Sequence, residues 1–200
     1  MNKIKLSIIA LACCFIASAQ NNFNQYSLEA GYGFNYARNP TLSGLNHFDA
    51  GIRYMQNEYW GAKADYGYDS FKSDNGLNTS TALNRISVQV VYNAGRLLHI
   101  NDIAKRMFNL LLHSGAGITF IDAPDAKPDR AGNFIVGGTG QLYLSEDFAL
   151  TGDLSGILNF SQNHNHNGEL KNQAFTGKVL TFSIGITYYV GRNKSTSDWR

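Results

Sequence analysis

The stretch that decides the fold of this 200-residue chain is Lys178–Val190, which reads KVLTFSIGITYYV. Large apolar residues recur at every second position, and the residues between them are mostly small or polar. Successive side chains of a β-strand point to opposite sides, so a period of two gives an extended strand one apolar and one polar face. A helix would scatter the same residues around its circumference. The expected apolar face comprises Leu180, Phe182, Ile184, Ile186, Tyr188 and Val190.

Seven earlier segments repeat this alternation, so the chain is expected to form about eight strands. Short turns are predicted at Gln56-Asn57 and Glu146-Asp147, and the middle connection, 96–106, is expected to contain one short helical turn. Alternating short and long connections are typical of an up-and-down barrel in a membrane. We therefore predict an all-β protein with an eight-stranded antiparallel up-and-down transmembrane β-barrel. Long loops are expected between residues 39 and 44, and at 72–81, 122–133 and 162–177.

Alternation does not say which face points inward, since a secreted lipocalin-like barrel carries its apolar face inside. Here the polar face consists mainly of Gly, Ser, Thr and Asn, which suits a narrow packed interior better than a surface in water. Aromatic residues lie at both ends of the apolar face, and small or aliphatic residues such as Ala50 and Leu112 lie between them. Two aromatic rings around an aliphatic band favour a bilayer over a ligand cavity. The expected periplasmic ring comprises Tyr26, Tyr54, Trp60, Tyr92, Phe108, Phe148 and Tyr188, and the outer ring Tyr36, Phe48, Tyr68, Phe120, Phe134, Phe160 and Phe182.

The N-terminal segment, residues 1–19, has the three parts of a secretory signal peptide. Lys3 and Lys5 precede an apolar core, and Ala17-Ser18-Ala19 forms a small-residue cleavage site before Gln20. We expect a barrel at 20–190 and a periplasmic tail at 191–200. The only two cysteines lie inside the signal, so the mature chain is expected to lack disulfides and thiol ligands.

The composition excludes one class of partner. The chain has 17 basic and 15 acidic residues, and loss of the two signal lysines leaves 15 of each. A balanced charge gives no electrostatic reason to bind nucleic acid. Twenty glycines, 3 prolines and 23 tyrosines and phenylalanines favour strands over helices.

The last strand also resembles a known signal. Its Ser183, Gly185, Tyr188 and Val190 resemble the closing-strand motif that outer-membrane β-barrels present to their assembly machinery. The mature chain as a whole resembles the small barrel of OmpA-like proteins, most clearly at 187–199, where a Gly-plus-basic segment leads to Asp-Trp. In longer members a similar segment leads to a peptidoglycan-binding domain, which this sequence lacks; it is either a barrel-only member or a truncated chain. The resemblance implies a bacterial outer-membrane location, with membrane lipids, lipopolysaccharide and the assembly machinery as partners.

Five charged residues are expected inside the barrel, in its periplasmic half. OmpA-like barrels are described as closed by such an internal salt-bridge cluster. One reading is a structural plug, because unpaired buried charge is costly and an eight-stranded interior is usually filled by side chains. The other is a gate that rearranges to pass small solutes. The expected cluster comprises Glu29, Arg53, Lys63, Asp65 and Asp153.

No catalytic residue, cofactor or metal site is expected. His164 and His166 could contribute to a metal site, but two histidines without a third ligand are more typical of a solvated loop. His113 faces inward but lies in the middle of its strand, and His47 lies near a loop with no evident partner, so neither is expected to form a catalytic group at the outer rim. Three functions are therefore considered: a structural barrel with exposed loops, a narrow channel, and a lipid-modifying enzyme, with the structural barrel favoured.

Overall fold

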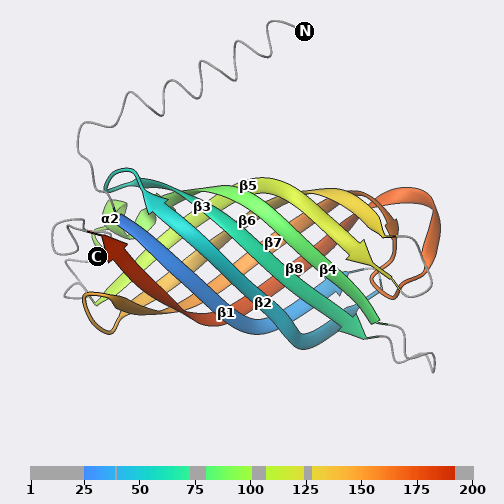
Figure 1. Cartoon of the computed structure of the whole chain (residues 1–200), viewed down its shortest axis with the longest axis horizontal. Helices are drawn as coiled ribbons and strands as arrows, with labels where there is room; N and C mark the ends of the chain where they lie inside the picture. The colour runs from blue at the N-terminus through green and yellow to red at the C-terminus, as the bar shows by residue number, and fades with distance from the viewer. Residues whose placement is uncertain (1–24, 39, 73–79, 101–106, 124–127, 192–200) are drawn as a thin grey trace, which may run out of the picture.

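In the computed structural model, which describes residues 25–38, 40–72, 80–100, 107–123 and 128–191, eight strands form a closed antiparallel barrel (Figure 1). Each strand pairs with its neighbours in sequence, and the first pairs with the last. The predicted fold class is confirmed. The strands are β1 (Gln25–Arg38), β2 (Leu42–Met55), β3 (Trp60–Lys72), β4 (Ser80–Asn93), β5 (Phe108–Asp122), β6 (Asp129–Tyr143), β7 (Phe148–His164) and β8 (Leu170–Gly191).

The two ends of the barrel differ in their connections. At what we call the turn end, on the left in Figure 1, lie the β2–β3 and β6–β7 turns and the helix α2 (Ala94–Leu97). At the loop end, on the right, lie the other four connections, including the β7–β8 hairpin. The described residues form no helix long and apolar enough to cross a membrane.

Side chains that accept backbone hydrogen bonds fix the structure at the turn end. Asn57 Oδ1 accepts from the N–H groups of Tyr59, at 2.9 Å, and Trp60, at 2.8 Å, as expected of an Asx turn. In the β6–β7 turn, Ser145 Oγ accepts in the same way from the Phe148 N–H at 3.1 Å. The Asn93 side chain caps α2 by accepting from the Arg96 N–H at 3.2 Å. Both predicted turns are confirmed; a short helical turn is present as well, but it begins at Ala94, two residues before the predicted connection.

All four predicted loops are too long, because the strands continue into them; β4, for example, already begins at Ser80. β2 starts at Leu42, β6 at Asp129, and β7 and β8 pair as far as His164 and Leu170. In a barrel embedded in a bilayer, strands that rise above the bilayer have water on their outer side, so nothing there selects apolar residues at alternate positions. Backbone pairing therefore persists where the alternating sequence pattern has ended. The prediction of a loop at 162–177 is wrong, because most of this segment belongs to β7 and β8. The part of loop 72–81 at residues 73–79 lies outside the described residues.

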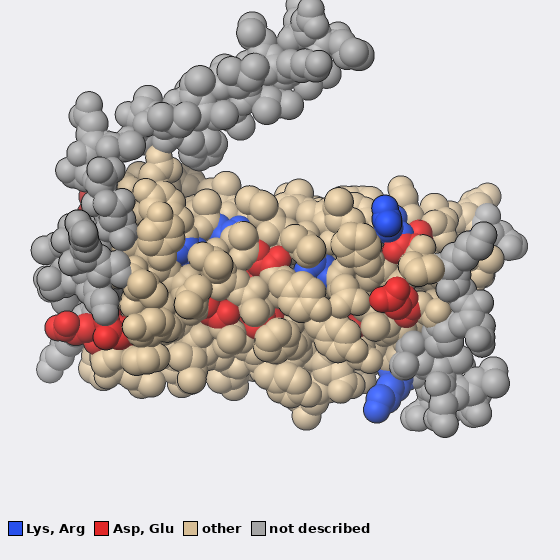
Figure 2. Space-filling view, viewed as in Figure 1, with Lys and Arg blue, Asp and Glu red and all other residues tan. Residues whose placement is uncertain are grey.

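The apolar face points outward, as predicted. Leu112, Ile184 and Val88 on this face are 47%, 57% and 66% exposed, whereas His113, on the opposite parity, is 5% exposed. The lipocalin-like alternative, with an apolar interior facing a ligand, is therefore wrong. Uncharged residues cover most of the wall on the side shown in Figure 2.

Aromatic rings meet across neighbouring strands at the turn end. The ring centroids of Tyr26 and Tyr54 are 5.0 Å apart, and those of Trp60 and Tyr92 are 4.7 Å apart. Phe148 and Tyr188 repeat the contact at 4.9 Å. These pairs come from the residues predicted to form the periplasmic ring. The predicted signal peptide, its cleavage site and the tail beyond Gly191 lie outside the described residues.

Candidate functional site

The lumen is the candidate site, because acidic, basic and histidine side chains from β1–β5 and β7 converge there. Inward-facing glycines leave them room: a Cβ at Gly67 would collide with the Arg85 guanidinium, and one at Gly137 would lie 2.6 Å from the His113 ring. Opposite Arg85 and His113, one neighbouring strand thus carries a glycine in place of a side chain. This explains part of the high glycine content.

Four of the five predicted cluster residues contact one another. The strand register sets Arg53 of β2 opposite Ser27 of β1 and Lys63 of β3. Arg53 forms an ion pair with Glu29, and the Lys63 ammonium lies 3.2 Å from the other Glu29 oxygen. Lys63 also contacts Asp65 at 3.0 Å. The Glu29 carboxylate therefore lies between two cations on neighbouring strands, and each cation has a carboxylate within reach.

Asp153, the fifth predicted residue, is held by different partners. Its carboxylate accepts hydrogen bonds from Thr139, at 2.6 Å, and Ser155, at 2.5 Å. One of its oxygens lies 3.0 Å from His113 Nε2, and His113 Nδ1 lies 2.7 Å from the Gln89 side chain. Sequence parity placed Asp153 in the lumen, but its partners come from β5, β6 and its own strand.

A second group of charges, closer to the loop end, was not included in the predicted cluster. Fully buried Asp69 accepts from the Arg85 guanidinium at 2.9 Å, and His47 Nδ1 lies 2.8 Å from its other oxygen. His47 Nε2 lies 3.4 Å from Asp49. His47 therefore has a partner at each ring nitrogen, contrary to expectation. The sequence could have predicted this group, because all four of its residues occupy the polar positions of the strand alternation: His47, Asp49, Asp69 and Arg85.

Together these residues form what we call the lumen network. It contains five carboxylates, three permanent cations and two histidines, each histidine placed against a carboxylate. The network comprises Glu29, His47, Asp49, Arg53, Lys63, Asp65, Asp69, Arg85, His113 and Asp153.

Two clusters of buried, mostly apolar side chains lie in the lumen, one on either side of the network. The loop-end layer comprises Ala37, Phe71, Leu83, Ile121, Ala131, Ile135, Ile157 and Val179, and the turn-end layer comprises Met55, Val91, Leu111, Tyr143, Ala149 and Tyr189. Between them, the network borders a cavity of only about 20 Å³, enough for roughly one water molecule. The sequence pattern predicts a polar inward face, and neither layer was expected from it. The sequence feature that could have predicted them is the presence of apolar residues near the strand ends at the alternate positions that are otherwise polar.

His164 and His166 do not lie in a solvated loop, so this expectation is wrong. His166 is fully buried, with its ring centroid 5.4 Å from that of Phe71 in an edge-to-face arrangement. His164 is 7% exposed, and its Nδ1 lies 3.9 Å from Asp129. The hairpin turns these side chains into the mouth of the barrel. Within the described part of the chain, no group of three or more His, Cys, Asp or Glu residues could hold a metal ion.

The residues of the closing-strand motif divide between the two faces of β8. Ser183 points into the lumen, and Tyr188 and Val190 point outward. Gly185 lies opposite Gly31 at the β1–β8 seam, where a Cβ on residue 185 would collide with the carbonyl oxygen of Ala30. This glycine therefore has a steric role in closing the barrel. Recognition of the four residues by assembly machinery stays a prediction.

Comparison with known proteins supports the fold. No known family profile and no curated protein matches the chain. A major outer membrane protein from Thermus thermophilus has a TM-score of 0.56 and 14% identity, with 83% of this chain and 99% of that one covered. Neisserial surface protein A has a TM-score of 0.55 and 11% identity, covering 82% and 95%, and OprG from Pseudomonas aeruginosa a TM-score of 0.55 and 9% identity, covering 84% and 97%.

At these identities the likeness concerns the fold alone. This chain has the fold of the small eight-stranded outer-membrane β-barrels. The predicted resemblance to the OmpA-like small barrel is confirmed at that level.

Proposed function

We propose that the chain is a structural outer-membrane β-barrel whose lumen is plugged and whose loop end is exposed to the outside of the cell. The observation that carries this proposal is a paired charge network in the lumen with a buried apolar layer on each side of it. Rearranging the ion pairs alone would leave both layers in place. The alternative, a narrow channel, would require movement of the charge network and of both apolar layers.

The location follows from the outer surface. Apolar side chains cover the wall, and aromatic pairs surround it at the turn end, which suits contact with lipid chains and headgroups. Together with the expected signal peptide, this supports secretion, cleavage before Gln20 and insertion by the barrel assembly machinery. Membrane lipids and lipopolysaccharide would then surround the wall.

A lipid-modifying enzyme is disfavoured by the geometry of its most promising residues. Ser155 and His113 both bond to Asp153, with Ser155 donating at 2.5 Å and the imidazole at 3.0 Å. In a serine nucleophile relay the imidazole must lie between the hydroxyl and the carboxylate. Here the carboxylate lies between the other two, inside a lumen closed at both ends. We infer a non-enzymatic role.

Planar-bilayer recording of the purified, refolded protein tests the plug. Correct folding is established first, by comparing gel mobility with and without boiling. We expect the folded barrel to insert and give no steady conductance steps. Reproducible single-channel steps from the boiling-sensitive species would contradict the plug and support the channel.

A further inference from the structure

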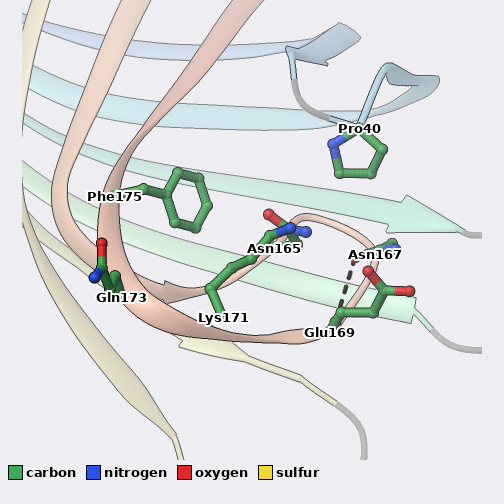
Figure 3. A pocket seen from close by; sticks show the side chains of 7 residues that line it. All are labelled: Pro40, Asn165, Asn167, Glu169, Lys171, Gln173 and Phe175. Carbon is green, nitrogen blue, oxygen red and sulfur yellow. Dashed lines mark hydrogen bonds between the residues drawn. The ribbon is translucent and has the colours of Figure 1, made fainter.

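The loop end carries a pocket of about 490 Å³ that the lumen does not explain (Figure 3). Its walls come from the β7–β8 hairpin and from Pro40 in the β1–β2 connection. Its volume lies within the roughly 300–1,000 Å³ typical of small-molecule sites. In Figure 3 the ring of Phe175 and the side chain of Lys171 lie on the same hairpin as Asn167 and Glu169, with Pro40 across the pocket.

The hairpin that supplies most of this pocket is held in place by its own contacts. At its tip, the Asn165 N–H donates to the Glu169 carbonyl at 2.8 Å, and Asn167 Oδ1 accepts from the Glu169 N–H at 3.3 Å. At its base, the Gln162 amide donates to the His164 carbonyl at 2.6 Å. Lys171, Gln173 and Phe175 alternate along β8, so their side chains share one face. The pocket is therefore formed before any ligand arrives.

The lining chemistry selects a class of ligand. Three amides offer donors and acceptors in equal measure, and the single carboxylate of Glu169 offsets the single ammonium of Lys171. A strongly anionic ligand would need more cations than this, and an acyl chain would need more apolar wall than Phe175 and Pro40 supply. Hydroxyl groups pair well with amides, and the half-buried ring of Phe175 can cover the C–H face of a sugar.

We propose that this pocket binds a neutral pyranose saccharide. The inference deepens the proposed function and rests on it in one respect: the pocket faces the cell exterior only if the loop end does. Two sources share the chemistry, namely neutral sugars of the cell's own lipopolysaccharide and glycans of another cell or polymer.

Saturation-transfer NMR on the folded full chain tests the binding itself. The detergent must not be an alkyl glycoside, because its headgroup would compete. The probes are methyl β-glucopyranoside, methyl α-mannopyranoside and lactose, with inorganic phosphate as the ionic comparison. We expect saturation of the sugar C–H protons by at least one neutral probe at millimolar concentration. Absence of transfer from all three sugars, or stronger binding of phosphate, would overturn the proposal.

Variants localise the site. Phe175→Ala and Gln173→Ala should each weaken binding about tenfold, because the aromatic and amide contacts are lost. Thr176→Ala is the matched control, since Thr176 is the exposed neighbour on the opposite face of the strand. Each variant must retain the boiling-dependent gel shift before it is measured. Unchanged binding in both pocket variants would contradict this site.

A separate experiment distinguishes failure of the orientation from failure of the site. Ala174→Cys places a thiol at an exposed hairpin position in a mature chain expected to have no other cysteine. A membrane-impermeant maleimide should label it on intact cells. Lack of labelling there, with labelling after lysis, would contradict the orientation and leave the saccharide site standing. Oligosaccharide released from the producing cell's own lipopolysaccharide, compared with the three probes, then identifies the source.

Discussion

The middle of the lumen and its two ends are filled by different kinds of side chain. In the middle, ion pairs such as Arg53–Glu29 and Arg85–Asp69 fill the space with charges that need one another. At the ends, mostly apolar side chains such as Leu83 and Leu111 fill it, and the Tyr189 hydroxyl in the turn-end layer donates to Gln141. A charged plug alone can open when water replaces a partner, whereas an apolar layer opens only when side chains move apart. The comparison implies that stability and closure depend on different residues.

The largest effect is expected from breaking the charged middle. Arg53→Ala should lower the free energy of unfolding by about 3–5 kcal/mol, toward the lower value because Lys63 still contacts Glu29. Conductance should stay low, because both apolar layers remain. Urea unfolding in lipid vesicles and planar-bilayer recording measure the two quantities. As a control, Glu29→Gln with Arg53→Met removes both charges and should recover much of the stability; steady conductance in Arg53→Ala would show that the layers do not seal the lumen.

The next effect tests the division between lumen and lipid on which this comparison rests. Leu112→Arg should cost about 2–4 kcal/mol, because it places a charge near the middle of the lipid-facing wall. Leu112→Met keeps the face apolar and should fold with nearly the original stability. Vesicle refolding followed by urea unfolding checks both. An unchanged stability in Leu112→Arg would mean that this face does not contact lipid.

Truncating the end layers should cost less stability and have more effect on closure. Leu83→Ala and Leu111→Ala should each lower the free energy of unfolding by about 2 kcal/mol, since each leaves a cavity that water can partly fill. Each single variant should stay closed because the opposite layer is intact, and the double variant should conduct briefly. Planar-bilayer recordings of the two single variants and the double variant measure the conductance. A double variant as silent as the parent would place the seal in the charged network instead.

The smallest effect concerns the seam that closes the barrel around both regions. Gly185→Ala should cost about 1–3 kcal/mol, because the added Cβ meets the Ala30 carbonyl on β1. Gly152→Ala is a suitable control, since a Cβ there has no atom within 4 Å. Unfolding midpoints of the two variants give the comparison. Equal midpoints would indicate that the seam can widen without cost.

Much of the architecture could be predicted because the pattern that encodes it is local. The alternation with neighbouring residues predicts which face of the strand Leu112 and Ile184 occupy. Asn57 stabilises a turn through a hydrogen bond to a residue only three positions away. The prediction of a loop at 162–177 was wrong for a related reason. Outside the bilayer β7 and β8 continue to pair, but their residues there do not alternate between apolar and polar, so the sequence gives no sign of the strands. His166 became a buried residue through a contact with Phe71, which is far away in the sequence.

The sequence by itself determined the number of strands, the outward direction of the apolar face and the presence of charges in the lumen, because a period of two acts over neighbouring residues. Only the tertiary structure decided that Glu29 lies between Arg53 and Lys63 and that Asp153 contacts His113. It also decided that inward-facing apolar side chains from different strands meet as two layers in the lumen. These contacts depend on the register between strands and on how the barrel closes, which bring together residues that no local pattern relates.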